Sequence, residues 1–330
     1  MQRILMTFVS LCLLTASAQA LEKVTVGTVP TVGDGPLICA IERGYFRDLG
    51  LDVELLPFPG VMQMTPLLAR GDLKMMGGPV SASFFNGIAR GLPLRYFVDR
   101  ARSPVWHGLI VRKELANKVK TAHDIKGLTI GVSGPGGVSE YEVGKWLEGA
   151  GLRLSDIQTK TLGMPESVAA VLNGAIDGAV FVPPFDAAVI AGGGFKVLNL
   201  DESVSPRLEV SGIIYNSDWA QANMDVVDRF TVGHIKGGRC YMEAARRGPN
   251  RAEMIGYLVK YGVVKDPALY ENQNWSELDR NGRIMVDSLI DQQDFYFRHG
   301  YVTEKLPASA IIDEGPVNRA LAQIGVVADD

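Results

Sequence analysis

The chain has 330 residues, which is enough for two domains of ordinary size. Apolar residues make up 47% and charged residues 21%, as in globular proteins, which excludes a disordered chain or a long coiled coil. There are 33 basic and 37 acidic side chains, so the net charge is −4, and no basic block occurs. We therefore expect no nucleic acid partner.

Residues 1–20 have the features of a secretory signal peptide. Arg3 precedes an apolar stretch at residues 4–16, and Ala18-Gln19-Ala20 matches the A-x-A pattern of a cleavage site. The stretch is too short to cross the hydrocarbon core of a bilayer, about 30 Å thick, as a helix. No later apolar run approaches the length of about 18 residues that a membrane-spanning helix needs. We expect residues 1–20 to be removed and the mature chain to reach the periplasm.

Two cysteines, Cys39 and Cys240, follow the signal peptide. An oxidising compartment permits a disulfide, but two cysteines far apart in the chain are no disulfide framework, and both lie in apolar, helix-like patterns. We therefore expect two buried free thiols. The four histidines are scattered and no metal-ligand spacing occurs, so we expect no metal site and no cofactor.

A weak internal repeat organises residues 24–182. In the first copy a strand, a loop rich in glycine and proline, a helix, a strand, a helix and a strand follow one another at residues 24–27, 28–36, 37–49, 52–57, 62–69 and 73–77. The second copy has the same order at residues 128–131, 133–138, 139–150, 158–162, 165–172 and 177–182. Each copy is a βαβαβ unit, which predicts a parallel sheet with right-handed crossovers. Two unrelated α/β segments are the alternative, and they also predict two α/β lobes.

The remaining segments predict how the lobes are joined. Residues 95–99 have the pattern of a further strand of the first lobe, and residues 106–112 and 210–215 that of two strands carrying the chain out and back. The chain then becomes mostly helical, at residues 220–245, 252–261 and 279–297. We predict an α/β protein of two lobes, each a mainly parallel sheet flanked by helices, with a ligand cleft between them. Residues 21–105 and 213–330 form the first lobe, and residues 106–212 form the second together with both crossover segments.

Both repeat units place a glycine-rich loop directly after their first strand, where open α/β sheets bind ligands. The candidate ligand-binding residues in these loops are Gly33, Asp34, Gly35, Pro36, Ser133, Gly136, Gly137, Val138 and Ser139. Each loop leads into a helix whose first N–H groups lack internal partners, which favours an anionic or strongly polar ligand. The second loop lacks the spacing of a P-loop or a dinucleotide site. Asp34 would oppose an anion, so it either points away or meets a positive part of the ligand.

Later strand ends and the crossover supply the other candidate walls, namely Gly78, Pro79, Ser81, Pro183, Phe185, Trp106 and His107. His107 is a candidate hydrogen-bond donor, or else a structural residue at the crossover. Arg102, like Arg100, can pair with a carboxylate or sulfonate, or else lie on the solvated surface. Met62 and Met164 are candidates for adaptable apolar walls, with core packing as the alternative.

Four blocks of the sequence, residues 35–46, 50–54, 67–79 and 124–132, resemble in their order the periplasmic substrate-binding proteins of ABC importers. The group concerned binds sulfonates, taurine, nitrate or thiamin pyrimidine precursors. The resemblance implies a two-lobe type II fold that closes on one small molecule and presents it to an inner-membrane permease powered by an ATPase. Pro183 stands where this group usually has an acidic residue, so the cleft edge lacks that charge.

We therefore expect an extracytoplasmic binding protein, monomeric and without chemistry of its own, for a small organic anion such as a sulfonate or a carboxylate. The aromatic side chains Phe181, Phe185 and Trp106 are compatible with an aromatic ligand. A pyrimidine or another heterocycle is the alternative ligand, and an enzyme on the same fold is a further one. Catalysis needs a nucleophile with a base, or paired carboxylates, and the candidate loops offer only serines, one histidine and Asp34. A sensor that hands its ligand to a receptor would use the same closed form.

Overall fold

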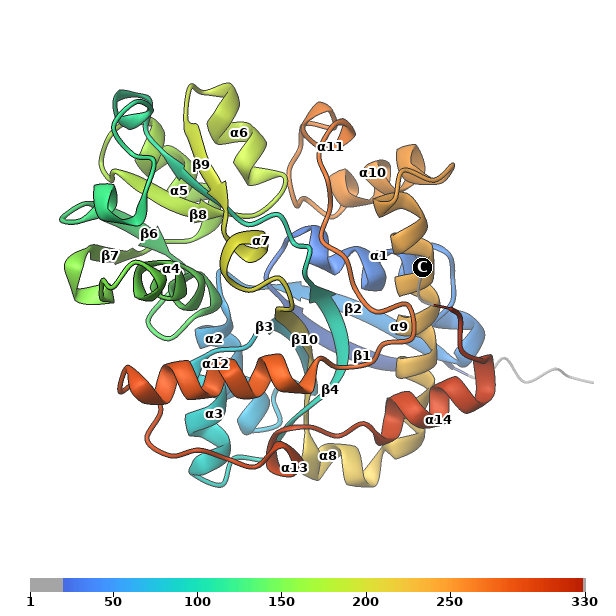
Figure 1. Ribbon diagram of the computed structural model, residues 1–330. Coiled ribbons are helices and arrows are strands. Elements are labelled where there is room, and N and C mark those ends of the chain that lie inside the picture. The colour runs from blue at the N-terminus through green and yellow to red at the C-terminus, as the bar shows by residue number, and fades with distance from the viewer. Residues whose placement is uncertain (1–19, 329–330) are drawn as a thin grey trace, which may run out of the picture.

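The computed structural model describes residues 20–328, which form two lobes (Figure 1). The predicted signal peptide lies outside the described residues except for Ala20, which is exposed. No helix within residues 20–328 is long and apolar enough to cross a membrane.

The first lobe contains a five-stranded sheet in the order β2-β1-β3-β10-β4. Its strands are β1 (Glu22–Thr28), β2 (Leu51–Pro57), β3 (Met75–Pro79), β4 (Leu94–Arg102) and β10 (Glu209–Asn216). β1 pairs in parallel with β2 and β3, whereas β10 lies antiparallel between β3 and β4. The sheet is therefore completed by a strand that comes from far along the chain.

The second lobe contains a sheet of the same kind in the order β7-β6-β8-β5-β9. Its strands are β5 (Gly108–Val111), β6 (Thr129–Val132), β7 (Gln158–Thr161), β8 (Gly178–Phe181) and β9 (Phe195–Asn199). β6 pairs in parallel with β7 and β8, and β5 lies antiparallel between β8 and β9. The two lobes thus share one strand order, of which the internal repeat predicts the three parallel strands but not the antiparallel strand beside them.

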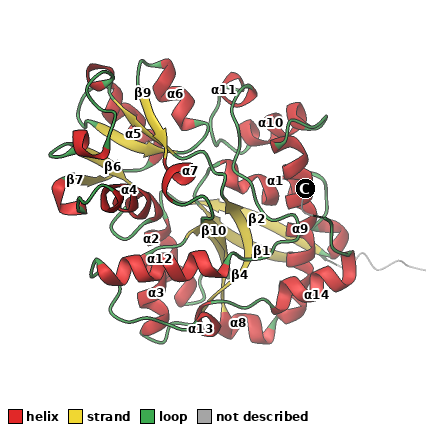
Figure 2. Cartoon of the chain, viewed as in Figure 1, coloured by secondary structure: helices red, strands yellow, loops and turns green. Residues whose placement is uncertain are grey.

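Helices cover both sheets (Figure 2). Those of the repeat units are α1 (Gly35–Glu42), α2 (Val61–Ala69), α4 (Val138–Gly149) and α5 (Met164–Leu172). The others before β10 are α3 (Ala82–Ala89), α6 (Phe185–Ala191) and α7 (Leu200–Val204). After β10 come α8 (Ser217–Ala222), α9 (Met224–Ala245), α10 (Arg251–Lys260), α11 (Ala268–Glu271), α12 (Val286–Arg298), α13 (Ala308–Ile311) and α14 (Gly315–Ile324). The predicted βαβαβ units are confirmed as β1-α1-β2-α2-β3 and β6-α4-β7-α5-β8.

Three predicted helices have different bounds in the structure, for local reasons. The helix expected at 37–49 ends at Glu42, because Gly44 takes a positive φ of 74° that turns the chain. The helix expected at 220–245 is two helices, α8 and α9, which meet at Asn223. The helix expected at 279–297 begins only at Val286, because the backbone N–H groups of Asp279 and Met285 bond to buried carboxylates instead.

The core of the first lobe has two layers. On one face of its sheet, Val26 and Phe97 pack against Phe230 of α9 and Leu321 of α14. On the other face lie α2, α3 and α12, and this cluster also takes in Val138 and Tyr141 of the second lobe. The aromatic ring of Tyr141 lies 5.2 Å from that of Phe295 in α12, measured between centroids. The two lobes therefore share buried apolar contacts.

The cysteine prediction is wrong, because Cys39 and Cys240 form a disulfide. Their Cα atoms lie 6.5 Å apart although 201 positions separate them in sequence. Cys39 lies on α1 and Cys240 on α9, and Gly237 lets these helices approach closely: a Cβ at Gly237 would meet the carbonyl oxygen of Pro36 at 2.1 Å. Sequence spacing could not show this contact, since it depends on how two distant helices pack.

The chain passes from the first sheet to the second between Arg102 and Gly108, and it returns between Asn199 and Glu209. The carboxylate of Asp201, fully buried on the return segment, accepts hydrogen bonds from the backbone N–H groups of Val105, Trp106 and His107 at 2.8–3.2 Å. Trp106 has a φ of 61°, in the left-handed region. Asp201 thus holds the outgoing crossover in a defined bend at the edge of the cleft.

Candidate functional site

A cavity of about 110 Å³ lies between the lobes, and both glycine-rich loops reach it. Gly33, from the loop after β1, and Ser133, Val138 and Ser139, from the loop after β6, line it together. An engineered cavity of about 150 Å³ holds benzene, so a cavity of this size suits a ligand of a few heavy atoms. The two loops that the repeat singles out therefore face one small, shared space.

Most of the lining is apolar. It includes Val29, Val32, Pro79, Ala101, Val105, Val138, Met164, Val180, Val182, Pro183 and Val210. Polar groups come from both lobes: Thr31, Arg100, Ser211 and Ser276 from the first, and His107, Ser133 and Ser139 from the crossover and the second. Such an apolar chamber with a few convergent polar groups is typical of sites for small organic molecules.

Arg100 is the charged group on the first lobe's side of the cavity. It is 3% exposed, donates a hydrogen bond from Nη1 to Ser211 Oγ at 2.9 Å, and forms an ion pair with the buried carboxylate of Asp34. Burial raises the pKa of Asp34, and the attraction of Arg100 opposes that rise. The alternative of a solvated surface arginine is wrong for Arg100. Asp34 stands behind the wall as the counterion of Arg100.

His107 is the titratable group on the other side. Its Nδ1 lies 2.8 Å and 3.0 Å from the two carboxylate oxygens of Glu142, a fully buried residue of α4. Burial lowers the pKa of His107, but the charge and hydrogen bond of Glu142, together with the charges of Asp201 and Asp186, outweigh it, so the pKa lies above its ordinary value. Burial likewise raises the pKa of Glu142, against the opposing effect of His107. The ring nitrogen Nε2 has no hydrogen-bond partner among residues 20–328.

The loop after β6 is partly satisfied by its own side chains. The hydroxyl of Ser139 accepts the N–H of Ser133 at 2.9 Å and lies 2.9 Å from the Ser133 hydroxyl, and Glu140 accepts the N–H of Gly136 at 2.8 Å. Within the described chain, the N–H group of Ser139 at the start of α4 has no hydrogen-bond partner. This amide and the hydroxyls of Ser133 and Ser139 are the donors that the loop can offer.

The structure places the remaining predicted residues outside the cavity wall. Gly35 and Pro36 are buried in the first turn of α1, Gly78 lies against Val61 of α2, and Phe185 belongs to the core of the second lobe. Met62 is 55% exposed at the start of α2, and Trp106 is half-buried at the crossover. Gly33, Pro79, His107, Ser133, Val138, Ser139, Met164 and Pro183 do line the cavity. That these residues contact a ligand stays a prediction.

Ser81, Gly136 and Gly137 instead join the two lobes directly. Ser81 and Gly137 form an isolated antiparallel bridge, and the N–H of Ala82 donates to the carbonyl oxygen of Gly136 at 2.8 Å. A Cβ at Gly136, whose φ is 63°, would lie 2.5 Å from the Cβ of Ala82. The loop after β6 therefore closes one side of the cavity against the start of α3.

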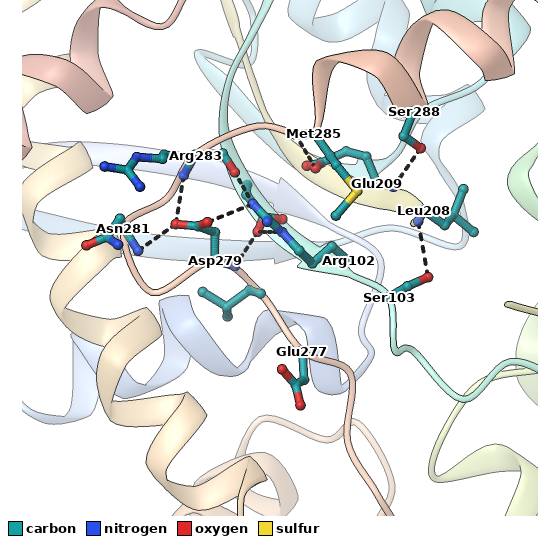
Figure 3. A network of polar contacts seen from close by, with 12 residues as sticks. Arg102, Ser103, Leu208, Glu209, Glu277, Asp279, Asn281, Arg283, Met285 and Ser288 are labelled. Atoms are coloured by element: carbon teal, nitrogen blue, oxygen red, sulfur yellow. Dashed lines mark hydrogen bonds and ion pairs between the residues drawn. The ribbon is translucent and has the colours of Figure 1, made fainter. Parts of the chain in front are cut away.

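Arg102 belongs to a separate buried network behind the crossover (Figure 3). Its guanidinium pairs with Asp99 at 2.9 Å and with Asp279 at 3.2 Å, and it also donates to the carbonyl oxygen of Arg283. In the same view, Glu209 accepts the N–H of Met285 at 2.8 Å, and its own N–H donates to Ser288 Oγ. Burial raises the pKa of Glu209 well above its ordinary value, and repulsion by Asp99 adds to this. The network ties β4 and β10 to the segment before α12.

Sequence reasoning missed several polar residues of the cavity. Ser211 lies on β10 and Ser276 on the loop after α11, both outside the repeat units that drew attention to the loops. Thr31 lies in the predicted loop, but its side chain carried no distinguishing pattern. The hydrophobic alternation on β4 and β10 is interrupted by register shifts between Glu209 and Gly212, so no simple periodicity marks which side chains face the cavity.

Solved structures show the class to which this fold belongs. The ligand-binding component of an ABC-type import system from Staphylococcus aureus, solved with zinc bound, superposes with a TM-score of 0.76 at 11% identity, covering 91% of this chain and 99% of that chain. The alkanesulfonate-binding protein SsuA from Xanthomonas axonopodis pv. citri, bound to MOPS, superposes with a TM-score of 0.71 at 18% identity, covering 89% and 99%. The chain has the two-lobe periplasmic-binding-protein fold.

The family follows from the sequence itself. Residues 34–244 match the family described as NMT1/THI5 like, and the chain belongs to this family. A curated relative, the 4-amino-5-hydroxymethyl-2-methylpyrimidine phosphate synthase of Schizosaccharomyces pombe, is 30% identical over 145 residues. That match spans 44% of this chain and only 40% of the relative.

Proposed function

We propose that this chain is the extracytoplasmic solute-binding component of an ABC importer. It captures one small organic molecule between its lobes and delivers the closed complex to a membrane permease with its ATPase. The observation that carries the proposal is the small apolar cavity lined by both glycine-rich loops. Location in the periplasm and action as a monomer are parts of the same proposal, and a gene for a permease beside this one would favour import over sensing.

A small organic anion, a carboxylate or a sulfonate, is the ligand class that we favour. The unpartnered N–H group of Ser139 at the start of α4 favours a negatively charged head group. The valine side chains of the lining would hold an apolar body, as the apolar wall of a ligand site does. Because the closed cavity is smaller than one that holds benzene, we expect a compact ligand.

A neutral heterocycle is the second candidate, and charge balance favours it. The two basic side chains of the cavity, Arg100 and His107, already face the carboxyl groups of Asp34 and Glu142. A ligand that brings a further charge into a space whose charges are balanced pays for its desolvation with hydrogen bonds alone. The pyrimidine named in the curated relative belongs to this class.

The arrangement supports binding better than turnover. A histidine held by a carboxylate is half of a nucleophile-activating triad, but in residues 20–328 no hydroxyl is hydrogen-bonded to Nε2 of His107. The nearby hydroxyls of Ser133 and Ser139 are bonded to each other. Conversion of a bound compound by the purified protein would revive the enzyme alternative.

Thermal-shift screening of the mature protein tests the proposal. A ligand that binds only the folded state stabilises it by RT ln(1 + [L]/Kd), about 2.7 kcal/mol at a hundredfold excess over Kd. The screen compares small carboxylates, small sulfonates, nitrate and 4-amino-5-hydroxymethyl-2-methylpyrimidine, and mass spectrometry identifies whatever co-purifies. A shift with one class names the ligand chemistry. The absence of any shift at millimolar concentration, with no co-purified compound, contradicts the proposal.

A further inference from the structure

The two ring nitrogens of His107 have different surroundings. Both oxygens of Glu142 lie within 3.0 Å of Nδ1, so that nitrogen and the carboxylate share a proton. The opposite ring nitrogen, Nε2, has no partner within the described chain, and His107 lines the cavity. The ring therefore offers the cavity a hydrogen-bond donor when Nε2 carries a hydrogen, and an acceptor when it does not.

Counting protons gives two states of the pair. With two protons, the pair is neutral overall, either as imidazolium with carboxylate or as imidazole with carboxylic acid, and in both forms Nε2–H is a donor. With one proton, Nδ1–H faces the carboxylate, the pair has a charge of −1, and Nε2 offers only a lone pair. One proton thus switches both the charge of the pair and the hydrogen-bonding role of the ring.

We propose that the His107–Glu142 pair is a specificity determinant of the site: it holds two protons in the binding-competent form and donates Nε2–H to an acceptor oxygen of the ligand. This inference rests on the proposed binding function and adds that ligand capture is linked to one proton.

The groups around the ring favour the two-proton form. Asp201 of α7 accepts the backbone N–H of His107, and Asp186 of α6 lies near enough to act on the imidazole. Asp186 is paired with Lys196 of β9 at 3.0 Å, whereas Asp201 is satisfied by backbone N–H groups without a cation beside it among residues 20–328. A pair with a charge of −1 would add a second uncompensated charge next to Asp201 in a buried place, which is unfavourable.

Loss of the proton should weaken the binding of an anionic ligand. A carboxylate or sulfonate oxygen meets a donor in the two-proton form, but meets a lone pair and a net negative charge after the proton is lost. Above the pH at which the pair loses its proton, affinity for such a ligand therefore falls by about tenfold per pH unit, as linkage to one proton requires.

Two variants separate this role from a structural one. His107→Gln keeps an N–H donor at the cavity but removes the titration. Glu142→Gln keeps the side chain's shape but removes the charge that holds the second proton. Titration calorimetry with acetate and with methanesulfonate between pH 6 and pH 10 measures affinity, and long-range ¹H–¹⁵N spectra of histidine-labelled protein report the proton on Nε2. His123, whose side chain makes no hydrogen bond or ion pair within residues 20–328, is the reference signal in the same spectra.

We expect a protonated Nε2 in His107 of the wild type at pH 7, and loss of that proton at lower pH in Glu142→Gln. We expect affinity that falls at high pH in the wild type, falls from a lower pH in Glu142→Gln, and is flat in His107→Gln. A bare Nε2 at pH 7, or parallel loss of affinity in wild type and His107→Gln, overturns the inference and leaves the binding function intact. If no compound of the screen binds at any pH, the proposed function fails and the ligand part of this inference falls with it, while the spectra still decide the protonation of the pair.

Discussion

A single residue, Arg100, connects three elements of the first lobe: the loop before α1, β3 and β10. Its guanidinium connects Asp34, in the loop before α1, to Ser211 of β10, and its side chain passes within about 3 Å of where a Cβ at Gly77 would stand. The ion pair is buried, so each partner depends on the other for compensation of its charge. Arg100 therefore fixes the position of the loop that forms one wall of the cavity.

Replacing Arg100 by methionine should destabilise the protein strongly. The carboxylate of Asp34 would remain buried without its counterion, and removal of one partner of a buried pair typically lowers the free energy of unfolding by about 3–5 kcal/mol. Urea denaturation measures the change. Arg70→Met is the matched control, since the Arg70–Asp72 pair is exposed and should contribute less than about 1 kcal/mol. Equal, small losses in both variants would show that Asp34 does not need Arg100.

The buried side chain of His234 should make the free energy of unfolding depend on pH. Burial lowers its pKa to about 4, and a hydrogen bond to the backbone oxygen of Asp99, 2.9 Å from Nε2, only partly opposes this. The unfolded chain binds a proton at this side chain near pH 6.5, so its contribution to stability is complete above that pH and is lost as pH falls toward 4. The difference amounts to about 3 kcal/mol at 1.36 kcal/mol per pKa unit.

Comparing wild type with His234→Gln isolates this contribution. Buried carboxyls such as Asp99 and Glu209, whose pKa values are raised, act in the opposite sense over an overlapping range. The quantity to follow is therefore the difference in unfolding free energy between the two proteins from pH 7 to pH 4.5. We expect that difference to shrink steadily with acid, and a constant difference would be evidence against a neutral, buried His234.

At the scale of elements, the loop after β6 and the start of α3 form the contact that closes the cavity. Gly136→Ala would place a methyl group 2.5 Å from the Cβ of Ala82 and also force alanine into a positive φ of 63°. We expect faster hydrogen exchange at the Ala82 amide, which donates to the Gly136 carbonyl, and weaker ligand binding. Gly127→Ala is the control, because its φ of 77° imposes similar strain with no neighbour within 4 Å. Similar exchange in both variants would assign the effect to strain alone.

The sequence predicts helices and strands well where hydrophobic periodicity and boundary glycines or prolines agree. It predicts them poorly where tertiary contacts decide whether a segment is helical. The βαβαβ units carry alternating apolar patterns bounded by glycine, so their order was readable. β9 was missed because its residues are half-buried or exposed and show no alternation. The composition of the segment before α12 predicts a helix, because nothing in it shows that Asp279 and Met285 bond to Asp99 and Glu209.

The residues of the candidate site likewise differ in how far the sequence predicts their positions. Loop residues such as Gly33 and Ser139 were found because a loop after a parallel strand has a predictable place. Arg100 and Arg102 could not be told apart, since residues two apart share a face in a regular strand. The register shifts between β4 and β10 break that regularity, so Arg100 reaches the cavity and Arg102 reaches Asp279.

At the scale of the whole molecule, the Cys39–Cys240 disulfide fastens the N-terminal helix α1 to α9. A cross-link restricts the unfolded chain, and removal of one typically lowers the free energy of unfolding by about 2–4 kcal/mol. We expect a lower melting temperature for the double variant Cys39→Ser, Cys240→Ser. Reductant should lower the melting temperature of the wild type and leave that of the double variant unchanged. A wild type indifferent to reductant under unfolding conditions would contradict a structural role for the bond.

The insertion of β10 between β3 and β4 has a consequence for the order in which the chain folds. A chain that is synthesised from its N-terminus presents residues 22–102 first, yet their sheet stays split until Glu209–Asn216 arrives to fill the gap. All five strands of the other sheet lie within residues 108–199, so that half can mature while the first half waits. We expect a fragment of residues 106–207 to give a cooperative melting transition alone and a fragment of residues 21–105 to give none. The half that emerges first would then be the last to become native.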